Sequence, residues 1–211
     1  MKNNIETILI LAPHTDDGEL GCGGSIARFI EEGKNVFYAA FSTAEKSVDP
    51  KLPNNILEIE VKAATKKLGI KRENLFIYNN EVRKLNYIRQ EILEKLIQLK
   101  AEINPEIIFM PSINDIHQDH STIAKEGLRA FKDRTILGYE LIWNNISFNT
   151  TSFITLQKRH VQAKVDALKE YKSQSDRAYM SHEFIFSLAK SRGVQIGKEY
   201  AECFEVIRWV M

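Results

Sequence analysis

Short apolar runs alternate along this chain with longer segments in which apolar residues recur every three or four positions. The apolar runs occupy residues 5–13, 35–42, 74–79 and 106–112. Runs of this length predict strands that are buried on both faces. The segments with helical spacing occupy residues 23–33, 56–69, 87–103 and 121–131. Strictly alternating strands and helices predict βαβ units with right-handed crossovers, so we expect an α/β fold with a mostly parallel central sheet.

The pattern becomes less regular after about residue 140. Residues 135–143 predict a further strand, and residues 156–174 and 181–193 predict two helices. Apolar alternation over 201–211 predicts a last strand, which we place at an edge of the sheet. This part could add an antiparallel edge or a small cap. No repeat, linker or low-complexity segment interrupts the chain, so residues 1–211 are interpreted as a single domain.

Composition narrows the class of protein without naming a function. The chain is 44% apolar and 27% charged, with a net charge of +1, which gives no general attraction for nucleic acid or an anionic membrane. No apolar stretch reaches the roughly 20 residues that span a bilayer, and the first apolar run is too short for a signal peptide. The two cysteines, Cys22 and Cys203, suggest a reduced pair. We therefore expect a cytoplasmic protein that binds neither nucleic acid nor membrane.

Polar clusters directly follow the first and the fourth predicted strand. The first cluster comprises His14, Asp16 and Asp17, and the second comprises Asp115, His117, Asp119 and His120. Ligands of open parallel sheets bind beyond the carboxyl ends of the strands, so both clusters can face one crevice. Crowded carboxylates repel one another unless a positive charge lies among them.

A divalent metal ion would supply that charge. Nitrogen and oxygen donors of this kind suit zinc first, and a catalytic zinc site uses three protein ligands with one open position. We therefore predict one Zn²⁺ per chain, with other divalent metals as alternatives. Taken singly, each cluster could instead be a helix N-terminus with hydrogen-bonded histidines. The remaining histidines, His160 and His182, lie in polar helical contexts and are expected at the surface.

The glycines near residue 20 do not have the spacing of a dinucleotide-binding loop, because Gly21, Gly23 and Gly24 are too close together. We expect Gly18 and Gly21 to adopt special backbone angles. Gly23 and Gly24 should let a helix approach the sheet closely.

Two stretches resemble a known family. "PHTDDGELGCGG" (13–24) resembles the PHPDD-x-x-x-G-x-GG signature of the PIG-L/LmbE-like zinc-dependent N-deacetylases, and "HQDH" (117–120) resembles their H-x-D-H signature. Further likeness in "EVKAATKKLG", "YKSQ" and "RGVQIGKEYAECFEVIR" extends the resemblance over almost the whole chain. It implies a Rossmann-like three-layer fold and a hydrolase that removes an N-acetyl or similar acyl group from an amino sugar or sugar conjugate.

The resemblance also implies a role for each residue of the two motifs. The zinc ligands would be His14, Asp17 and His120. Asp16 would be the general base, His117 the electrostatic or general-acid group, and Asp119 the partner of His117. The chain departs from the family at Thr15, where proline is usual, and at Leu57, where many members have an arginine.

Substrate contacts are less well marked by the sequence. The polar loop 42–55 follows a predicted strand and is expected to shape the substrate pocket, with Glu45 and, from a later loop, Arg83 as candidate contacts. The chain is compatible with a homo-oligomer. Two alternatives to an N-deacetylase stay open here. They are a non-catalytic sugar- or nucleotide-binding protein of the same fold, and a phosphoesterase that holds two metal ions.

Overall fold

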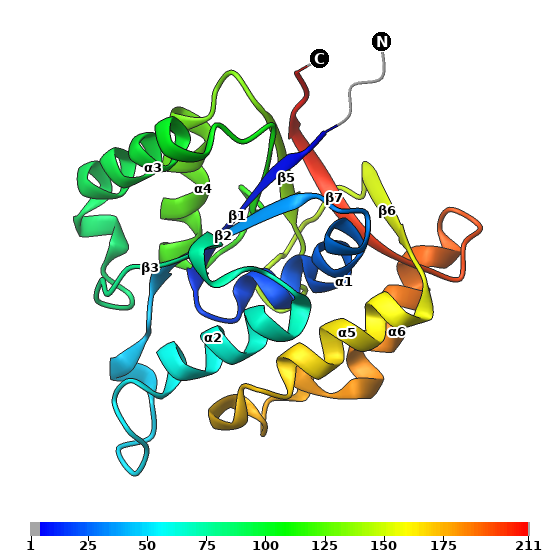
Figure 1. Cartoon of the computed structure of the whole chain (residues 1–211), viewed down its shortest axis with the longest axis horizontal. Helices are drawn as coiled ribbons and strands as arrows, with labels where there is room; N and C mark the ends of the chain where they lie inside the picture. Colours follow the sequence, from blue (N-terminus) through cyan, green and yellow to red (C-terminus); the bar gives the residue numbers. More distant parts are fainter. Residues whose placement is uncertain (1–4, 211) are drawn as a thin grey trace.

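The computed structural model describes residues 5–210, in which seven strands form one mixed sheet of order β3-β2-β1-β4-β5-β7-β6 (Figure 1). The strands are β1 (Thr7–His14), β2 (Asn35–Ser42), β3 (Leu75–Ile77), β4 (Ile107–Pro111), β5 (Thr135–Tyr139), β6 (Ser152–Leu156) and β7 (Tyr200–Arg208). The first five are parallel, and β7 pairs antiparallel with both β5 and β6. The predicted α/β fold with a mostly parallel sheet is confirmed.

Helices cover both faces of this sheet and make three layers. The longer helices are α1 (Asp17–Glu31), α2 (Ile56–Leu68), α3 (Arg89–Ile103), α4 (Gln118–Ala130), α5 (Lys158–Leu168) and α6 (His182–Val194). In Figure 1, α3 and α4 lie on one side of the sheet, while α1, α2, α5 and α6 lie on the other. None of the helices in residues 5–210 combines the length and the apolar character needed to cross a bilayer.

Strand β1 shows why the apolar runs become central strands. Its side chains alternate in direction, so Ile8 and Ile10 enter the core under α1 and α2, whereas Leu9 and Leu11 enter the core under α3 and α4. All four are 0–1% exposed. Burial of each such side chain stabilises the fold by about 1.5–3 kcal/mol, so a run that is apolar at every position fits only a strand covered on both sides.

The predicted position of the last strand was wrong. Strand β7 lies inside the sheet, where Leu137 of β5 faces Val206 and Ser152 of β6 faces Phe204. The edge strand is β6, which the apolar pattern did not predict because it is short and only partly buried. Strand β7 is buried from Tyr200 to Glu205, as expected for a strand with neighbours on both sides.

The sheet order reverses between β1 and β4. From β1 the chain moves outward to β2 and β3, and from β4 it moves outward in the opposite direction to β5. The connections after β1 and β4 therefore leave the sheet in opposite directions and open a crevice at the carboxyl ends of these two strands. Helix α1 begins three residues after β1 ends, and the loop before α4 follows β4, so both polar clusters lie at this crevice.

Gly18 and Gly21 act through close approach to the sheet rather than through their backbone angles. Positive φ occurs among the described glycines at Gly33, Gly69 and Gly197, so the prediction of special angles at Gly18 and Gly21 was wrong. A Cβ atom at Gly18 would lie 2.4 Å from the Tyr38 ring, and one at Gly21 would lie 2.4 Å from the Tyr139 ring. The first turn of α1 thus rests directly on aromatic side chains of the sheet.

Candidate active site

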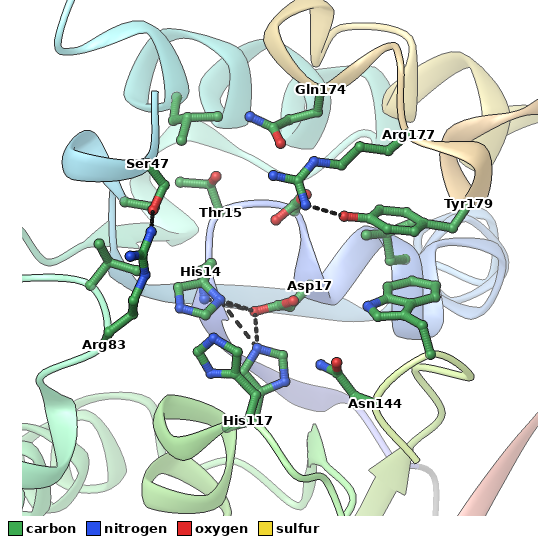
Figure 2. A pocket seen from close by; sticks show the side chains of 17 residues that line it. His14, Thr15, Asp17, Ser47, Arg83, His117, Asn144, Gln174, Arg177 and Tyr179 are labelled. Atoms are coloured by element: carbon green, nitrogen blue, oxygen red, sulfur yellow. Dashed lines mark hydrogen bonds and ion pairs between the residues drawn. The ribbon is translucent and has the colours of Figure 1, made fainter. Parts of the chain in front are cut away.

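A cavity of about 410 Å³ opens at the crevice between β1 and β4 (Figure 2). Its floor holds side chains from both polar clusters. These are His14, Asp16, Asp17, His117 and His120. The prediction that the two motifs share one crevice is confirmed, since His14 Nδ1 lies 3.1 Å from His120 Nε2 although 106 residues separate them.

Three donor atoms on the cavity floor form a nearly equilateral triangle. Asp17 Oδ2 lies 3.2 Å from His14 Nδ1 and 3.2 Å from His120 Nε2, and the two nitrogens are 3.1 Å apart. A tetrahedral zinc ion with bonds of about 2.0–2.1 Å needs ligand atoms roughly 3.4 Å apart. This donor set therefore fits one face of a zinc tetrahedron with only small movements.

The second nitrogen of each histidine in the triangle is held by a carboxylate. His14 Nε2 lies 3.0 Å from Asp119 Oδ2, and His120 Nδ1 lies 2.8 Å from Asp115 Oδ2. If these nitrogens carry the protons, the facing nitrogens present lone pairs to the same point. Carboxylates behind the ligating histidines are the usual support of protein zinc sites. The Asp119 carboxylate is therefore the partner of His14, whereas the resemblance had made Asp119 the partner of His117.

His117 completes a cluster of three histidines whose ligand atoms all lie within 4.8 Å of one another. It is the N-cap of α4, and its Nδ1 accepts a hydrogen bond of 3.2 Å from the Asp119 backbone N–H. The proton of a neutral ring must then be on Nε2. Burial and the neighbouring His120 and His14 rings lower the pKa of His117 to about 4, which keeps the ring neutral at pH 7.

Adjacent carboxylates Asp16 and Asp17 have opposite environments. Burial raises the pKa of both groups, but the His120 and His14 rings beside Asp17 hold the pKa of its carboxyl far below the ordinary range. Asp16 occupies the N-cap position of α1 without accepting a cap hydrogen bond, and burial together with the Asp17 charge raises its pKa to about 6. Both carboxylates line the cavity, but only Asp17 belongs to the donor triangle.

The two histidines of the triangle attract protons when no cation is present. Burial opposes the charged form of each ring. Asp17 and Asp119 nevertheless raise the pKa of His14 to about 9, and Asp17 and Asp115 raise that of His120 to about 10. Positive charge is therefore favoured at this point of the cavity, and a metal ion can supply it in place of the protons.

Comparison with known proteins identifies the family to which this chain belongs. The sequence profile of the PIG-L family, described as GlcNAc-PI de-N-acetylase, matches residues 9–131, which is more than half of the chain. The chain belongs to the PIG-L family. The matched region contains both polar clusters and the strands β1 and β4 that place them.

The individual proteins that this chain resembles share between 16% and 28% of its sequence. The chain is 28% identical to the uncharacterized deacetylase YaiS of Escherichia coli, over 81% of this chain and 93% of that protein. Its fold is similar to that of N,N'-diacetylchitobiose deacetylase from Pyrococcus horikoshii, with a TM-score of 0.80, 21% identity, and coverage of 97% and 84% of the two chains. The fold is equally similar to GalB of Pseudomonas putida, a 4-carboxy-2-hydroxymuconate hydratase, with a TM-score of 0.80, 16% identity and 98% coverage of both chains. The fold alone therefore does not decide the reaction.

The upper wall of the cavity in this PIG-L family member comes from segments that carry no motif. The rings of Trp143 and Tyr179 stack with centroids 3.9 Å apart at an angle of 12°. Arg177 Nη1 donates a 2.5 Å hydrogen bond to the Tyr179 hydroxyl, and Figure 2 shows the guanidinium beside the Tyr179 ring. Together they give one wall an aromatic face and a cation.

This wall was not predicted from the sequence. The missed lining residues are Trp143, Asn144, Gln174, Arg177 and Tyr179. The apolar pattern placed Trp143 at the end of the predicted strand 135–143 and Gln174 at the end of the predicted helix 156–174. In the structure β5 already ends at Tyr139 and α5 at Leu168, so these residues belong to the loops and turns that follow. The "YKSQ" stretch, which ends at Gln174, was a signal through its likeness to the family, but nothing local pointed to Trp143.

The candidate substrate residues from the loops have different positions. Arg83 lines the cavity, and its Nη2 donates a 2.8 Å hydrogen bond to Ser47 Oγ in the loop 42–55. Ala44, at φ 49°, turns that loop so that Ala44 and Ser47 line the cavity and Glu45 does not. The Glu45 carboxylate instead accepts a 3.4 Å hydrogen bond from Thr43, so the structure does not support it as a contact.

Arg83 is held in a strained conformation by the same carboxylate that supports His14. Its φ is 65°, a left-handed value that side chains other than glycine rarely adopt. Asp119 accepts hydrogen bonds from the backbone N–H groups of Arg83 at 2.6 Å and Leu85 at 3.1 Å. The strain is therefore maintained by contacts at the site, as is common for functional loops.

One expectation about the remaining histidines was wrong. His160 is only 5% exposed, and its Nε2 lies 2.5 Å from a Glu31 oxygen, because α5 packs against α1 with this ring at the interface. His182 is exposed at the start of α6, as predicted.

Proposed function

We propose that this chain is a zinc-dependent hydrolase that removes an N-acetyl group from an amino sugar or sugar conjugate. The observation that carries the proposal is the donor triangle of His14, Asp17 and His120. Asp16 lines the same cavity, is not part of the triangle and accepts no hydrogen bond as the N-cap of α1. The family description, GlcNAc-PI de-N-acetylase, supports removal of an N-acetyl group from an amino sugar in a conjugate.

The residues present fit the metal. His14, Asp17 and His120 would hold one Zn²⁺, with Asp119 and Asp115 fixing the two imidazole tautomers. Zinc in such a site lowers the pKa of a coordinated water toward neutrality.

Asp16 and His117 would handle the proton and the developing charge. Asp16 has a pKa of about 6, so it is mostly ionised at pH 7 and accepts a proton from the attacking water. The neutral His117 ring donates through Nε2 to the amide carbonyl oxygen as negative charge builds there. The protonated Asp16 can then return the proton to the amine that leaves.

The cavity wall suits a sugar. The Trp143–Tyr179 stack presents an aromatic face to the apolar side of a pyranose ring, while Arg83, Ser47 and Asn144 offer polar groups to its hydroxyls. We propose Arg83 as a substrate contact, positioned by the Asp119 carboxylate.

The experiment is acetate release from a panel of N-acetylated sugars and sugar conjugates, with metal-free protein and with added Zn²⁺. Zinc-dependent release from at least one N-acetyl sugar is expected. Asp16→Asn should keep its zinc and lose about 10²–10⁴-fold in rate. Asp17→Asn should lose zinc under the same supply, because a neutral amide is the poorer ligand.

Three outcomes would contradict the proposal. Equal zinc loss in the two variants would show that the ligand and base roles are assigned wrongly. Sugar binding without any release would favour the non-catalytic alternative. Two metal ions per chain with phosphate release from phosphoesters would favour the phosphoesterase.

A further inference from the structure

Helix α1 is broken in the middle, and side chains from the C-terminal part of the chain join the two pieces. Cys22 has φ −147° and ψ 24°, which is not helical. In a continuous helix the Gly24 N–H would donate to the Leu20 carbonyl. Here the Gly24 N–H donates to Glu202 at 3.0 Å, and the Leu20 carbonyl accepts a 2.7 Å hydrogen bond from Lys164 Nζ.

The two joining side chains form a buried ion pair. Lys164 of α5 and Glu202 of β7 are 5% and 7% exposed and lie 2.7 Å apart, and Glu202 also accepts from the N–H and the hydroxyl of Ser25. Burying two charges has a large desolvation cost, and a packed apolar pair would often be as stable. Stability alone therefore does not explain this ion pair. The helix break leaves the Gly24 N–H and the Leu20 carbonyl without their usual helical partners, and the ion pair supplies the missing hydrogen bonds.

The glycines Gly23 and Gly24 make the join possible. A Cβ atom at Gly23 would lie 2.9 Å from Lys164 Cγ, and one at Gly24 would lie 2.5 Å from Leu156 and 3.2 Å from Glu202. Without side chains at these positions, Lys164 and Glu202 reach the helix backbone. This assigns a role to the second half of the glycine-rich stretch.

The segment before the break is fixed at its other end as well. The hydroxyls of Tyr38 and Tyr171 donate to the Thr15 carbonyl at 2.9 and 2.6 Å. Asp17 lies between this anchor and the Leu20 carbonyl that Lys164 holds. We propose that Lys164 and Glu202 are positioning residues for the metal site, because they fix the broken turn of α1 that presents Asp17 to His14 and His120.

This inference rests on the metal site proposed above, and zinc affinity tests it without reference to turnover. Zinc is titrated into metal-free wild type and metal-free Lys164→Met in competition with a chelating dye. Lys164→Met should bind zinc about 10–100-fold more weakly, which is the loss that removal of a supporting partner of a metal ligand typically causes.

Arg192→Met is the matched control. It also removes the cation of a largely buried pair, with Glu140, which lies in the same small cavity as Lys164 but makes no hydrogen bond to α1 in the described part of the chain. Its zinc affinity should stay within about two-fold of wild type, whatever happens to its melting temperature.

A milder variant covers the case in which Lys164→Met does not fold. Gly23→Ala adds one methyl group against the Lys164 stem and should also weaken zinc binding, by less than Lys164→Met. If folded Lys164→Met or Gly23→Ala binds zinc as wild type does, the ion pair is purely structural and the inference is wrong. If Arg192→Met weakens zinc equally, the effect is general destabilisation and the inference again fails. If wild type binds no zinc, it is the proposed metal site itself that fails.

Discussion

Asp16 and Asp17 show that two identical side chains on consecutive residues can have different environments. Asp17 is the first residue of α1 and lies in contact with both His14 and His120. Asp16 ends the preceding loop and lines the cavity, and within residues 5–210 its side chain makes no hydrogen bond or ion pair with either ring. A sequence change of carboxylate to amide at these neighbours is therefore expected to have two different outcomes.

Asp115 provides a test of the support behind the donor triangle. Asp115→Asn removes the charged acceptor 2.8 Å from His120 Nδ1, so the ring loses its fixed tautomer and part of its basicity. We expect zinc affinity to fall by about 10–100-fold, measured by competition with a chelating dye. Asp133→Asn is the control, since its exposed carboxylate pairs with Lys100 and neither residue lines the cavity. Unchanged zinc affinity in Asp115→Asn would remove Asp115 from the site.

Gly21 tests the close approach of α1 to the sheet. Gly21→Ala places a methyl group 2.4 Å from the Tyr139 ring, which is fully buried and cannot move aside. Overpacking of this kind should lower the free energy of unfolding by about 1–3 kcal/mol, measured by urea denaturation. Gly33→Asn should cost much less, because the space at Gly33 is open and asparagine tolerates its φ of 75°. A neutral effect of Gly21→Ala would mean that the turn can shift outward.

At the scale of elements, the packing of α5 on α1 explains a histidine that the sequence misplaced. His160 and Arg159 of α5 both contact the Glu31 carboxylate at the end of α1, at 2.5 Å each. These contacts lower the pKa of Glu31 from 4.5 to about 2, and Arg159 contributes more to this shift than His160. These contacts of Arg159 and His160 with Glu31 join α5 to α1, the same two helices that Lys164 joins at the break.

The sign of this pKa shift gives a pH prediction. A carboxyl whose pKa is lowered by folding stabilises the fold above its unfolded pKa and loses that contribution as the pH falls through the folded pKa. The melting temperature of wild type should therefore exceed that of Glu31→Gln at pH 6, by a small margin because the group is exposed. The difference should shrink between pH 4.5 and pH 2. A difference that is constant over this range would show that the contact is not ionic.

At the scale of the whole molecule, the site is built by distant parts of the chain. The matched family region supplies the donor triangle, whereas the aromatic wall and the Lys164–Glu202 pair come from residues after 140. The antiparallel strand β7 lies beside β5 and so brings Glu202 under α1. The C-terminal part thus adds the expected antiparallel edge to the sheet, through β7 and β6, and also completes the cavity.

A metal ion that bridges β1, α1 and α4 should stabilise the whole fold. Zinc at about 100 times its dissociation constant should raise the free energy of unfolding by about 2.7 kcal/mol, which thermal melts with and without zinc can detect. His120→Ala, which removes one corner of the triangle, should show no such rise at the same zinc concentration. An equal rise in this variant would show that zinc binds elsewhere on the chain.

The sequence by itself determined the order of strands and helices up to about residue 140, the strand-end location of both motifs and, through their spacing, the family. These features depend on local periodicity and on residues close together in the chain, such as the apolar run of β1 that feeds both cores. Only the tertiary structure decided that β7 lies inside the sheet, that Asp119 supports His14, that His160 is buried against Glu31, and that Trp143, Arg177 and Tyr179 form the cavity wall. Each of these depends on contacts between segments that lie far apart in the chain. Such contacts are chosen by how whole elements pack, and no local pattern of apolar and polar residues encodes them.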